Sequence, residues 1–302
     1  MADHHRRPVL VIGATGQQGG ATAQQLLERG RPVRALVRDS DSPRARTLRT
    51  AGAGLAVGDL DDPTSLRKAM KGVHGVFLVL TMMVGPRISP EGVAAEERRG
   101  KAVADLAREL GIEHLVYSSL NGADAHSGIP YYESKQRIEE HLRSLGLPAT
   151  ILRPVSFMDN FATYNRPVLD NGELVLGLAV RPQIPMPLIA VRDIGAFGAI
   201  AFDRPEHFLG RTVEIAGDVL TPPQIAETFG RHCGLPARLR QVPVEEIRAF
   251  DQQLAKMFEF FNGHPAEPPD ISALREVHPG LMTLGTWLRS TGWKANPGNE
   301  ET

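Results

Sequence analysis

The stretch VLVIGATGQQGG, residues 9–20, decides how this chain folds. Four apolar residues form a short run typical of a buried strand, and glycines then follow at positions 13, 16 and 19. In this spacing Gly13 permits a tight turn, Gly16 lets a ligand approach the backbone, and Gly19 lets the next helix pack against the strand. The N–H groups at the start of that helix favour anions. We therefore expect a dinucleotide site; the alternative is an ordinary strand–helix turn.

Buried strands and amphipathic helices alternate through the first half of the chain. The apolar runs predict strands at Val9–Ile12, Val33–Val37, Leu55–Val57, Val76–Leu80, Leu115–Tyr117 and Thr150–Leu152. The intervening segments predict helices at Gly19–Arg29, Arg44–Thr50, Thr64–Met70, Glu91–Leu110 and Tyr132–Leu145. Short apolar strands separated by helices indicate an α/β fold, a doubly wound parallel sheet covered on both faces.

The pattern loosens after Pro154, where prolines are more frequent and the elements are shorter. It predicts helices at Asp193–Phe202, Pro222–Cys233, Val244–Asn262 and Leu284–Ser290, and a strand at Thr212–Ala216. We expect a dinucleotide-binding domain over residues 1–153. Residues 154–302 then form a smaller α+β lobe for substrate or partner, with some segments returning to the first sheet.

Composition excludes several classes of protein. The 302 residues contain 34 basic and 35 acidic side chains. The chain therefore lacks the basic excess that would suggest a nucleic-acid partner. The apolar run before Gly13 is too short for a signal peptide. The sequence also lacks a run of about 18 apolar residues, which a membrane-spanning helix would need. The histidines show no metal-ligand spacing, so we expect no metal. These features predict a cytoplasmic protein with no membrane association.

The end of the second predicted strand bears on the choice of nucleotide. Arg38 and then Asp39 follow the strand VRALV directly. An arginine here suits the 2′-phosphate of NADP, whereas an acid suits the ribose hydroxyl of NAD. We therefore expect NADP(H) to be preferred, with NAD(H) as the alternative. Asp59, at the end of the third strand, and Thr81, after the fourth, lie on the same ligand side of the sheet.

Several segments together resemble the NmrA-like family, atypical relatives of the extended short-chain dehydrogenases. They are GATGQQGG, GDLDD, LVYSSLNGA, PYYESK and ATILRPVSFMDN, and the late LMTLGTWL segment also looks like the family's C-terminus. The resemblance implies a Rossmann-type sheet with a small C-terminal lobe. Its implied cofactor residues are Gly13, Thr15, Gly16, Gln17, Gly19, Arg38, Asp59, Leu60, Thr81 and Lys135, with Pro154, Ser156 and Phe157 flanking the nicotinamide.

The segment IPYYESK raises the question of catalysis. Tyr131 and Lys135 are four positions apart, so a helix starting here presents both on one face. An ammonium beside a tyrosine favours the phenolate, which suits proton donation to a carbonyl. Many sensor-like members of the family lack this tyrosine. Ser118 or Ser119 is expected to polarise the carbonyl, although the loop from Leu120 to Pro130 is short.

The family implies two functions. The first is an oxidoreductase, an NADPH-dependent reductase of a small apolar carbonyl or quinone-like compound that uses Tyr131 and Lys135. The second is a catalytically inactive NADP(H) redox sensor that regulates a protein partner, with Lys135 only anchoring the cofactor. The sequence also leaves open whether Tyr131 or Tyr132 faces the site, and whether the protein is a monomer or a homodimer. The segment EERRGK, residues 96–101, is expected to be a solvated helix face.

Overall fold

The computed structural model describes residues 7–85, 87–265 and 267–295. By internal contacts the chain divides into two units, one of residues 1–153 and 194–214, the other of residues 154–193 and 215–302. Each unit has its own apolar core, as the two separate clusters of buried side chains show. The predicted helices and strands of the first half therefore belong to one unit.

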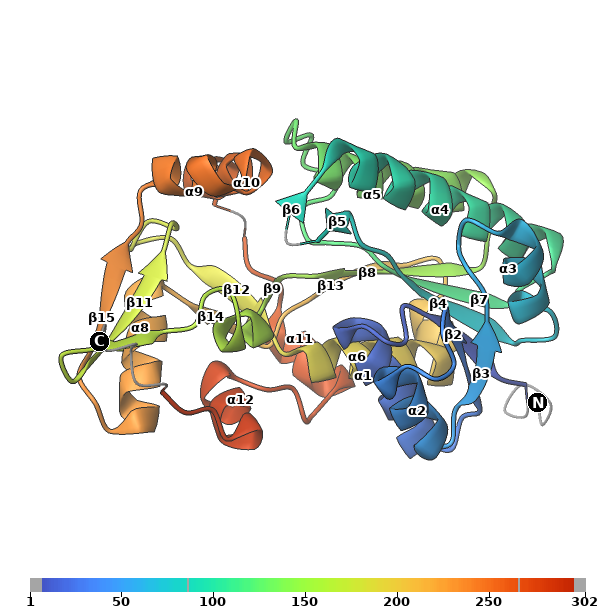
Figure 1. Ribbon diagram of the computed structural model, residues 1–302, viewed down its shortest axis with the longest axis horizontal. Helices are drawn as coiled ribbons and strands as arrows, with labels where there is room; N and C mark the ends of the chain where they lie inside the picture. Colours follow the sequence, from blue (N-terminus) through green and yellow to red (C-terminus); the bar gives the residue numbers. More distant parts are fainter. Residues whose placement is uncertain (1–6, 86, 266, 296–302) are drawn as a thin grey trace. The chain divides into compact units, whose positions relative to one another are not determined.

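A seven-stranded sheet forms the centre of the first unit (Figure 1). In order across the sheet the strands are β3 (Gly54–Val57), β2 (Val33–Val37), β1 (Val9–Ile12), β4 (Gly75–Val79), β7 (His114–Ser118), β8 (Ala149–Pro154) and β13 (Thr212–Ile215). The pairs from β3 to β8 are all parallel. The order reverses between β1 and β4, where ligands bind in open sheets of this kind.

Helices cover both faces of this sheet (Figure 1). One face carries α1 (Gln17–Glu28), α2 (Pro43–Thr50) and α6 (Val191–Asp203), and the other carries α3 (Pro63–Met70), α4 (Pro90–Glu109) and α5 (Pro130–Ser144). The apolar strands are buried on both sides as a result; Leu10, Val76 and Leu115, for example, are fully buried. The predicted α/β fold with a doubly wound sheet is confirmed.

Helix starts in the first unit follow from local sequence. Asp62 caps α3 by accepting the Thr64 N–H at 3.0 Å, and Pro63 follows at the first helical position. Ser89 caps α4 in the same way, accepting the Gly92 N–H at 3.0 Å. Between β4 and α4 the chain makes a small hairpin of β5 (Met83–Val84) and β6 (Arg87–Ile88).

The second unit contains short strands that sequence periodicity does not predict. They are β9 (Ser156–Phe157), β10 (Val168–Asp170), β11 (Glu173–Leu178), β12 (Met186–Ile189), β14 (Asp218–Leu220) and β15 (Ala237–Gln241). They form two three-stranded sheets, β10–β11–β15 and β14–β12–β9. The helices of this unit are α8 (Pro222–Cys233), α9 (Val244–Phe250), α10 (Gln252–Gly263), α11 (Ile271–Val277) and α12 (Leu284–Thr291).

One predicted helix is interrupted in the structure. The expected helix at 244–262 is two helices, α9 and α10, separated at Asp251. Asp251 is extended, with φ −149° and ψ 114°, and its carboxylate accepts the N–H groups of Gln253 and Leu254. A capping aspartate starts a new helix here rather than continuing the old one. In the part of the chain that the structure describes, no helix is both long and apolar enough to cross a membrane.

Candidate dinucleotide and catalytic site

The glycine-rich turn after β1 has little room for side chains. Gly13 has a φ of 78°, and a Cβ atom on it would lie 2.7 Å from the Val79 side chain. A Cβ on Gly19 would lie 2.2 Å from the Gly13 carbonyl oxygen, closer than real Cβ contacts. A Cβ on Gly16 would lie 3.2 Å from the same oxygen. The backbone of α1 therefore starts directly against the turn, an arrangement that leaves its N–H groups accessible to a ligand.

The first turn of α1 is not capped by a side chain. Gly16 is the N-cap residue, so no hydroxyl or carboxylate occupies the first N–H groups of the helix. The next residue but one, Gln18, links this turn to the sheet because its amide oxygen accepts the Ser118 hydroxyl proton at 2.7 Å. The structure thus brings Ser118, at the end of β7, against the glycine-rich turn. Gln17 is exposed at the start of the helix.

Two arginines lie near the carboxyl ends of β1 and β2. Arg38 is exposed, and among the described residues its guanidinium has no carboxylate partner. Arg44, in the first turn of α2, donates to the main-chain oxygen of Thr15 at 2.8 Å. The Asp39 carboxylate accepts the N–H of Asp41 at 2.8 Å and so shapes the loop. Arg44 was not predicted; its sequence signal is its place six residues after Arg38, at a helix start.

The ends of β3 and β4 supply further polar groups. The Asp59 carboxylate accepts the Asp61 N–H at 2.9 Å, and Ser65 donates to the main chain of this same turn. Leu60 is partly buried and packs against the core of the first unit. The Thr81 hydroxyl accepts the Met83 N–H at 3.1 Å. These residues all follow strands at the same edge of the sheet as the glycine-rich turn.

The Lys135 ammonium is buried in an ion pair that the sequence does not indicate. Lys135 Nζ donates to Glu96 Oε1 at 2.8 Å, and the two side chains are 7% and 0% exposed. Ser134 donates to the other oxygen of Glu96 at 3.2 Å. The expectation that residues 96–101 form a solvated face is wrong for Glu96, which points from α4 into its contact with α5. Helix α4 also packs closely on α5 at Gly100.

Tyr131 and Tyr132 lie side by side at the start of α5. Both are 4% exposed, and their ring centroids are 4.9 Å apart in an edge-on arrangement. Burial raises the pKa of Tyr132 well above its ordinary value, although hydrogen bonding with Tyr131 opposes this. Lys135 Nζ also lies 5.8 Å from the ring centroid of Tyr117 on β7. Burial and the carboxylates of Glu96 and Glu139 raise the pKa of that tyrosine as well.

Ser119 belongs to a separate buried network. Its hydroxyl donates to Glu139 Oε1 at 2.6 Å, and Glu139 also accepts two hydrogen bonds from Arg153, at 3.0 and 2.7 Å. Arg153 pairs in turn with Asp124 at 2.8 Å, which ties down the loop before Tyr131. The Ser119 proton is therefore directed at a carboxylate, whereas Ser118 is directed at the glycine-rich turn.

Three predicted residues belong to the second unit. Pro154 ends β8, and Ser156 and Phe157 form β9, which pairs in parallel with Leu188 and Ile189 of β12. Both β9 residues are partly exposed, and Pro154 is buried. Ser156 and Phe157 are thus presented by a strand of a different sheet from the one that carries the glycine-rich turn, whereas Pro154 ends β8 of that same sheet.

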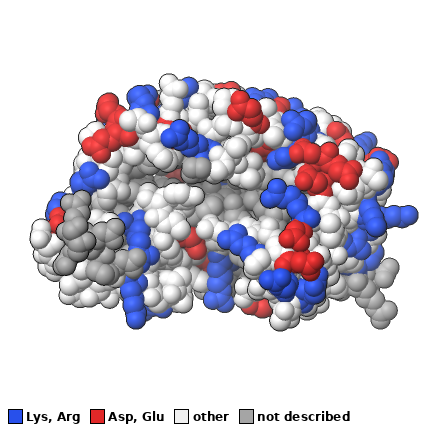
Figure 2. All heavy atoms as spheres, viewed as in Figure 1, with Lys and Arg blue, Asp and Glu red and all other residues white. Residues whose placement is uncertain are grey.

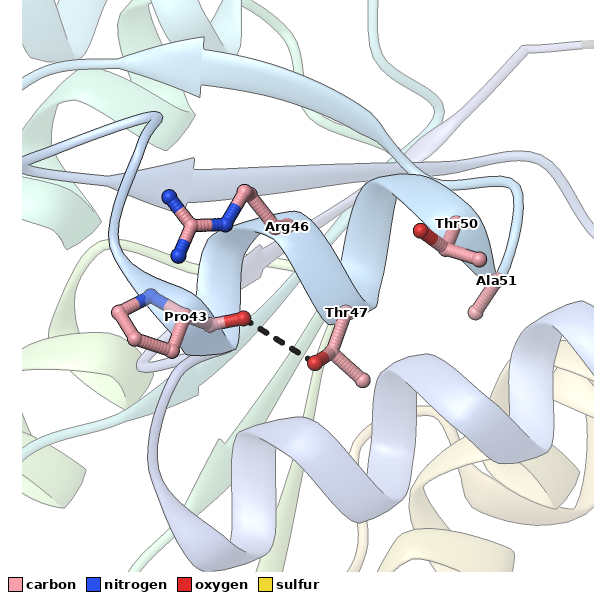
Figure 3. Close-up of a pocket in the computed structure, with 5 residues that line it drawn as sticks. All are labelled: Pro43, Arg46, Thr47, Thr50 and Ala51. Carbon is pink, nitrogen blue, oxygen red and sulfur yellow. Dashed lines mark hydrogen bonds between the residues drawn. The ribbon is translucent and has the colours of Figure 1, made fainter.

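Two features of the described surface bear on further sites. On the face shown in Figure 2, basic and acidic side chains are interspersed rather than gathered into one broad patch. The hollow drawn in Figure 3 lies on the outside of α2 between Pro43 and Ala51, where Thr47 donates to the Pro43 carbonyl at 3.1 Å. It contains no group for acid–base chemistry. Among the described residues there is no cluster of three or more His, Cys, Asp or Glu that could hold a metal.

Comparison with known proteins finds relatives that match most of the chain. It is 28% identical to an NmrA-like family domain-containing protein of Dictyostelium discoideum, covering 85% of this chain and 87% of that one. It is 27% identical to an NAD(P)H azoreductase of Xenophilus azovorans, over 80% and 79% of the two chains.

Solved structures share the fold. NmrA, a negative transcriptional regulator, in complex with NADP aligns with a TM-score of 0.79 at 22% identity over 94% of each chain. The triphenylmethane reductase of Citrobacter sp. complexed with NADP(H) aligns with a TM-score of 0.76 at 22% identity, over 93% and 99% of the two chains. The model of the NmrA-like family matches residues 5–288. The chain therefore belongs to the NmrA-like family.

Proposed function

We propose that this protein binds NADP(H) and reduces a small apolar carbonyl or quinone-like compound. The observation that carries the cofactor proposal is the pairing of an uncapped helix start at the glycine-rich turn with Arg38 and Arg44 nearby. The free N–H groups at the start of α1 suit a pyrophosphate. Two guanidinium groups without carboxylate partners in the described chain suit a 2′-phosphate. The NAD(P)H azoreductase relative agrees with this choice.

In the proposed reaction the cofactor and the protein side chains would have different roles. A bound nicotinamide supplies the hydride. Tyr131 is the proposed donor of the proton that the substrate oxygen gains, and Ser118 the donor that polarises that oxygen. Lys135 would hold the ribose hydroxyls. Ser119 is a weaker candidate than Ser118, because Glu139 accepts its proton.

The cofactor proposal is tested by fluorescence titration with NADPH and NADH. We expect NADPH to bind more tightly, and Arg38→Ala to remove most of the difference. A charge-assisted contact contributes about 1.5–3 kcal/mol, or about tenfold to a hundredfold in affinity. Equal dissociation constants for the two cofactors would contradict the preference. Turnover is tested by NADPH oxidation with a panel of quinones, azo compounds and aromatic ketones.

A second candidate function is a redox sensor that binds NADP(H) without turnover and acts on a protein partner. Two observations favour it: Glu96 neutralises the charge that would acidify Tyr131, and Ser119 is held by Glu139. A sensor requires the cofactor to bind two states of the protein differently. NADPH binding without oxidation across the panel, together with changes in hydrogen exchange remote from the glycine-rich turn, would favour this function over the reductase.

A further inference from the structure

Glu96 is a buried carboxylate beside Lys135. It lies in the second turn of α4, has no exposed surface, and faces α5. Its two oxygens have different partners: Oε1 accepts from Lys135 and Oε2 accepts from Ser134. A carboxylate in this position is stabilised only by these partners, since burial of an unpaired charge is costly.

The lysine that it holds has hydrogen-bonding capacity left over. An ammonium has three N–H donors, and within the described residues only Glu96 accepts one. The Lys135 side chain is only 7% exposed, so water satisfies its two remaining N–H donors poorly. A pair of hydroxyl groups, as on a ribose, matches the two remaining donors.

The second contact of Glu96 reaches the start of α5. The Ser134 hydroxyl lies 3.2 Å from Glu96 Oε2 and also 3.2 Å from the main-chain oxygen of Tyr131. Because a hydroxyl has one proton, these two oxygens compete for it, so the direct partners of Glu96 are Lys135 and, by this shared proton, Ser134. Of the Tyr131–Lys135 pair, Lys135 is the member that this carboxylate from the neighbouring helix holds.

We propose that Glu96 is a positioning residue of the cofactor site, which fixes the Lys135 ammonium for the cofactor ribose. This inference rests on the proposed function. The other titratable groups around Lys135 are Tyr117 on β7 and, on α5 itself, Tyr131, Tyr132 and Glu139. Glu139 is already engaged by Arg153, Arg143 and Ser119, so Glu96 is the carboxylate that compensates Lys135.

The chain offers a matched control in the adjacent residue. Glu97 is on the same helix and also reaches α5, through Arg137 at 2.8 Å, and it pairs with Lys101 at 2.6 Å. It is more exposed and contacts neither Lys135 nor Ser134. Glu97→Gln therefore removes a carboxylate between the same two helices without touching the proposed site.

The experiment measures NADPH dissociation constants between about pH 7 and about pH 10 for the wild-type protein, Glu96→Gln and Glu97→Gln. Without this carboxylate the buried Lys135 ammonium has no charge partner among the described residues, so its charged form becomes less favourable. We expect NADPH affinity of Glu96→Gln to fall at least about tenfold as pH rises across this range, with a much smaller fall in the wild type. Glu97→Gln should follow the wild type. A purely structural role for Glu96 would lower the melting temperature without changing the pH dependence.

Glu96→Asp keeps the charge and shortens the side chain, so it provides a second test of the inference if Glu96→Gln does not fold. We expect weaker NADPH binding with the pH dependence of the wild type. Wild-type affinity in Glu96→Asp, or wild-type pH dependence in a folded Glu96→Gln, would overturn the inference while leaving the proposed function intact. No NADPH binding by the wild-type protein would overturn both.

Discussion

The Arg44 guanidinium donates a hydrogen bond to the main-chain oxygen of Thr15 across 2.8 Å, joining the start of α2 to the glycine-rich turn. The contact uses one of five N–H donors, so most of the guanidinium remains available to a ligand. Because Arg38 lies just after β2, in the loop that leads to α2, the two arginines provide two places for a phosphate contact near one strand end.

The first prediction concerns Arg44. Arg44→Ala should weaken NADPH binding by about tenfold while changing NADH binding little, because only NADPH carries the 2′-phosphate. Arg46→Ala is the control, since Arg46 belongs to the same helix but donates to the oxygen of Asp41 in its own loop. Fluorescence titration of both variants with both cofactors gives the answer. Equal losses for NADPH and NADH would mean that Arg44 supports the turn rather than the phosphate.

The second prediction concerns the packing of α1. In Gly19→Ala the new methyl would lie 2.2 Å from the Gly13 oxygen, so the helix or the turn must move. We expect a cost of about 1–3 kcal/mol, a melting temperature lower by several degrees, and a large loss of NADPH binding. Gly54→Ala is the control, because its Cβ would lie 3.6 Å from the nearest atom, the Val33 oxygen. A Gly19→Ala protein with normal melting and normal NADPH affinity would contradict this account.

The third prediction separates the two tyrosines. If Tyr131 is the proton donor, Tyr131→Phe should leave NADPH binding nearly unchanged and lower kcat by about 10²–10⁴, the usual contribution of general acid catalysis. Tyr132→Phe should have a smaller effect on kcat, because burial holds the pKa of Tyr132 far above neutral pH. Steady-state oxidation of NADPH by the best substrate of the panel measures both. A larger loss in Tyr132→Phe would reverse the assignment.

Sequence predicts the first unit well because its strands are buried on both faces. Runs such as Val9–Ile12 and Val33–Val37 are the observed strands, since mainly apolar residues fit between two helix layers. The second unit is harder because strands such as β15, with the sequence ARLRQ, alternate exposed charges with partly buried residues. The break between α9 and α10 depends on one capping side chain, Asp251, within an otherwise helical pattern.

Some residues of the candidate site can likewise be predicted from the sequence, and others cannot. Spacing alone locates the glycines and Arg38, because these depend on the strand that precedes them. Spacing cannot indicate the partner of Lys135, which lies on another helix 39 positions away. The segment 96–101 contains five charged residues, so its one buried carboxylate looks no different in sequence from its exposed neighbours. Contacts between helices, rather than motifs, decide how the charges of this site are balanced.

The last prediction concerns stability and rests on His114, at the start of β7. His114 is 1% exposed, and its Nε2 lies 2.8 Å from the Thr150 hydroxyl oxygen. Thr150 already donates its proton to the Phe208 carbonyl, so the histidine must be the donor and carry its proton on Nε2. Nδ1 is buried with no hydrogen-bond partner among the described residues. Burial, assisted by His74 and Arg31, lowers the pKa of His114 from 6.5 to about 3.

Because the folded pKa is lower than the unfolded one, the unfolded state binds more protons between about pH 3 and about pH 6.5. The free energy of unfolding should therefore fall as pH drops through this window, by several kcal/mol at the acid end. His114→Gln, whose amide can still donate to Thr150, should flatten this part of the stability profile. His141→Gln is the control, since His141 is partly exposed and pairs with Asp105 at 2.7 Å. Urea unfolding between pH 4 and pH 7 measures the slopes, and an unchanged slope in His114→Gln would contradict the assignment of this acid sensitivity to His114.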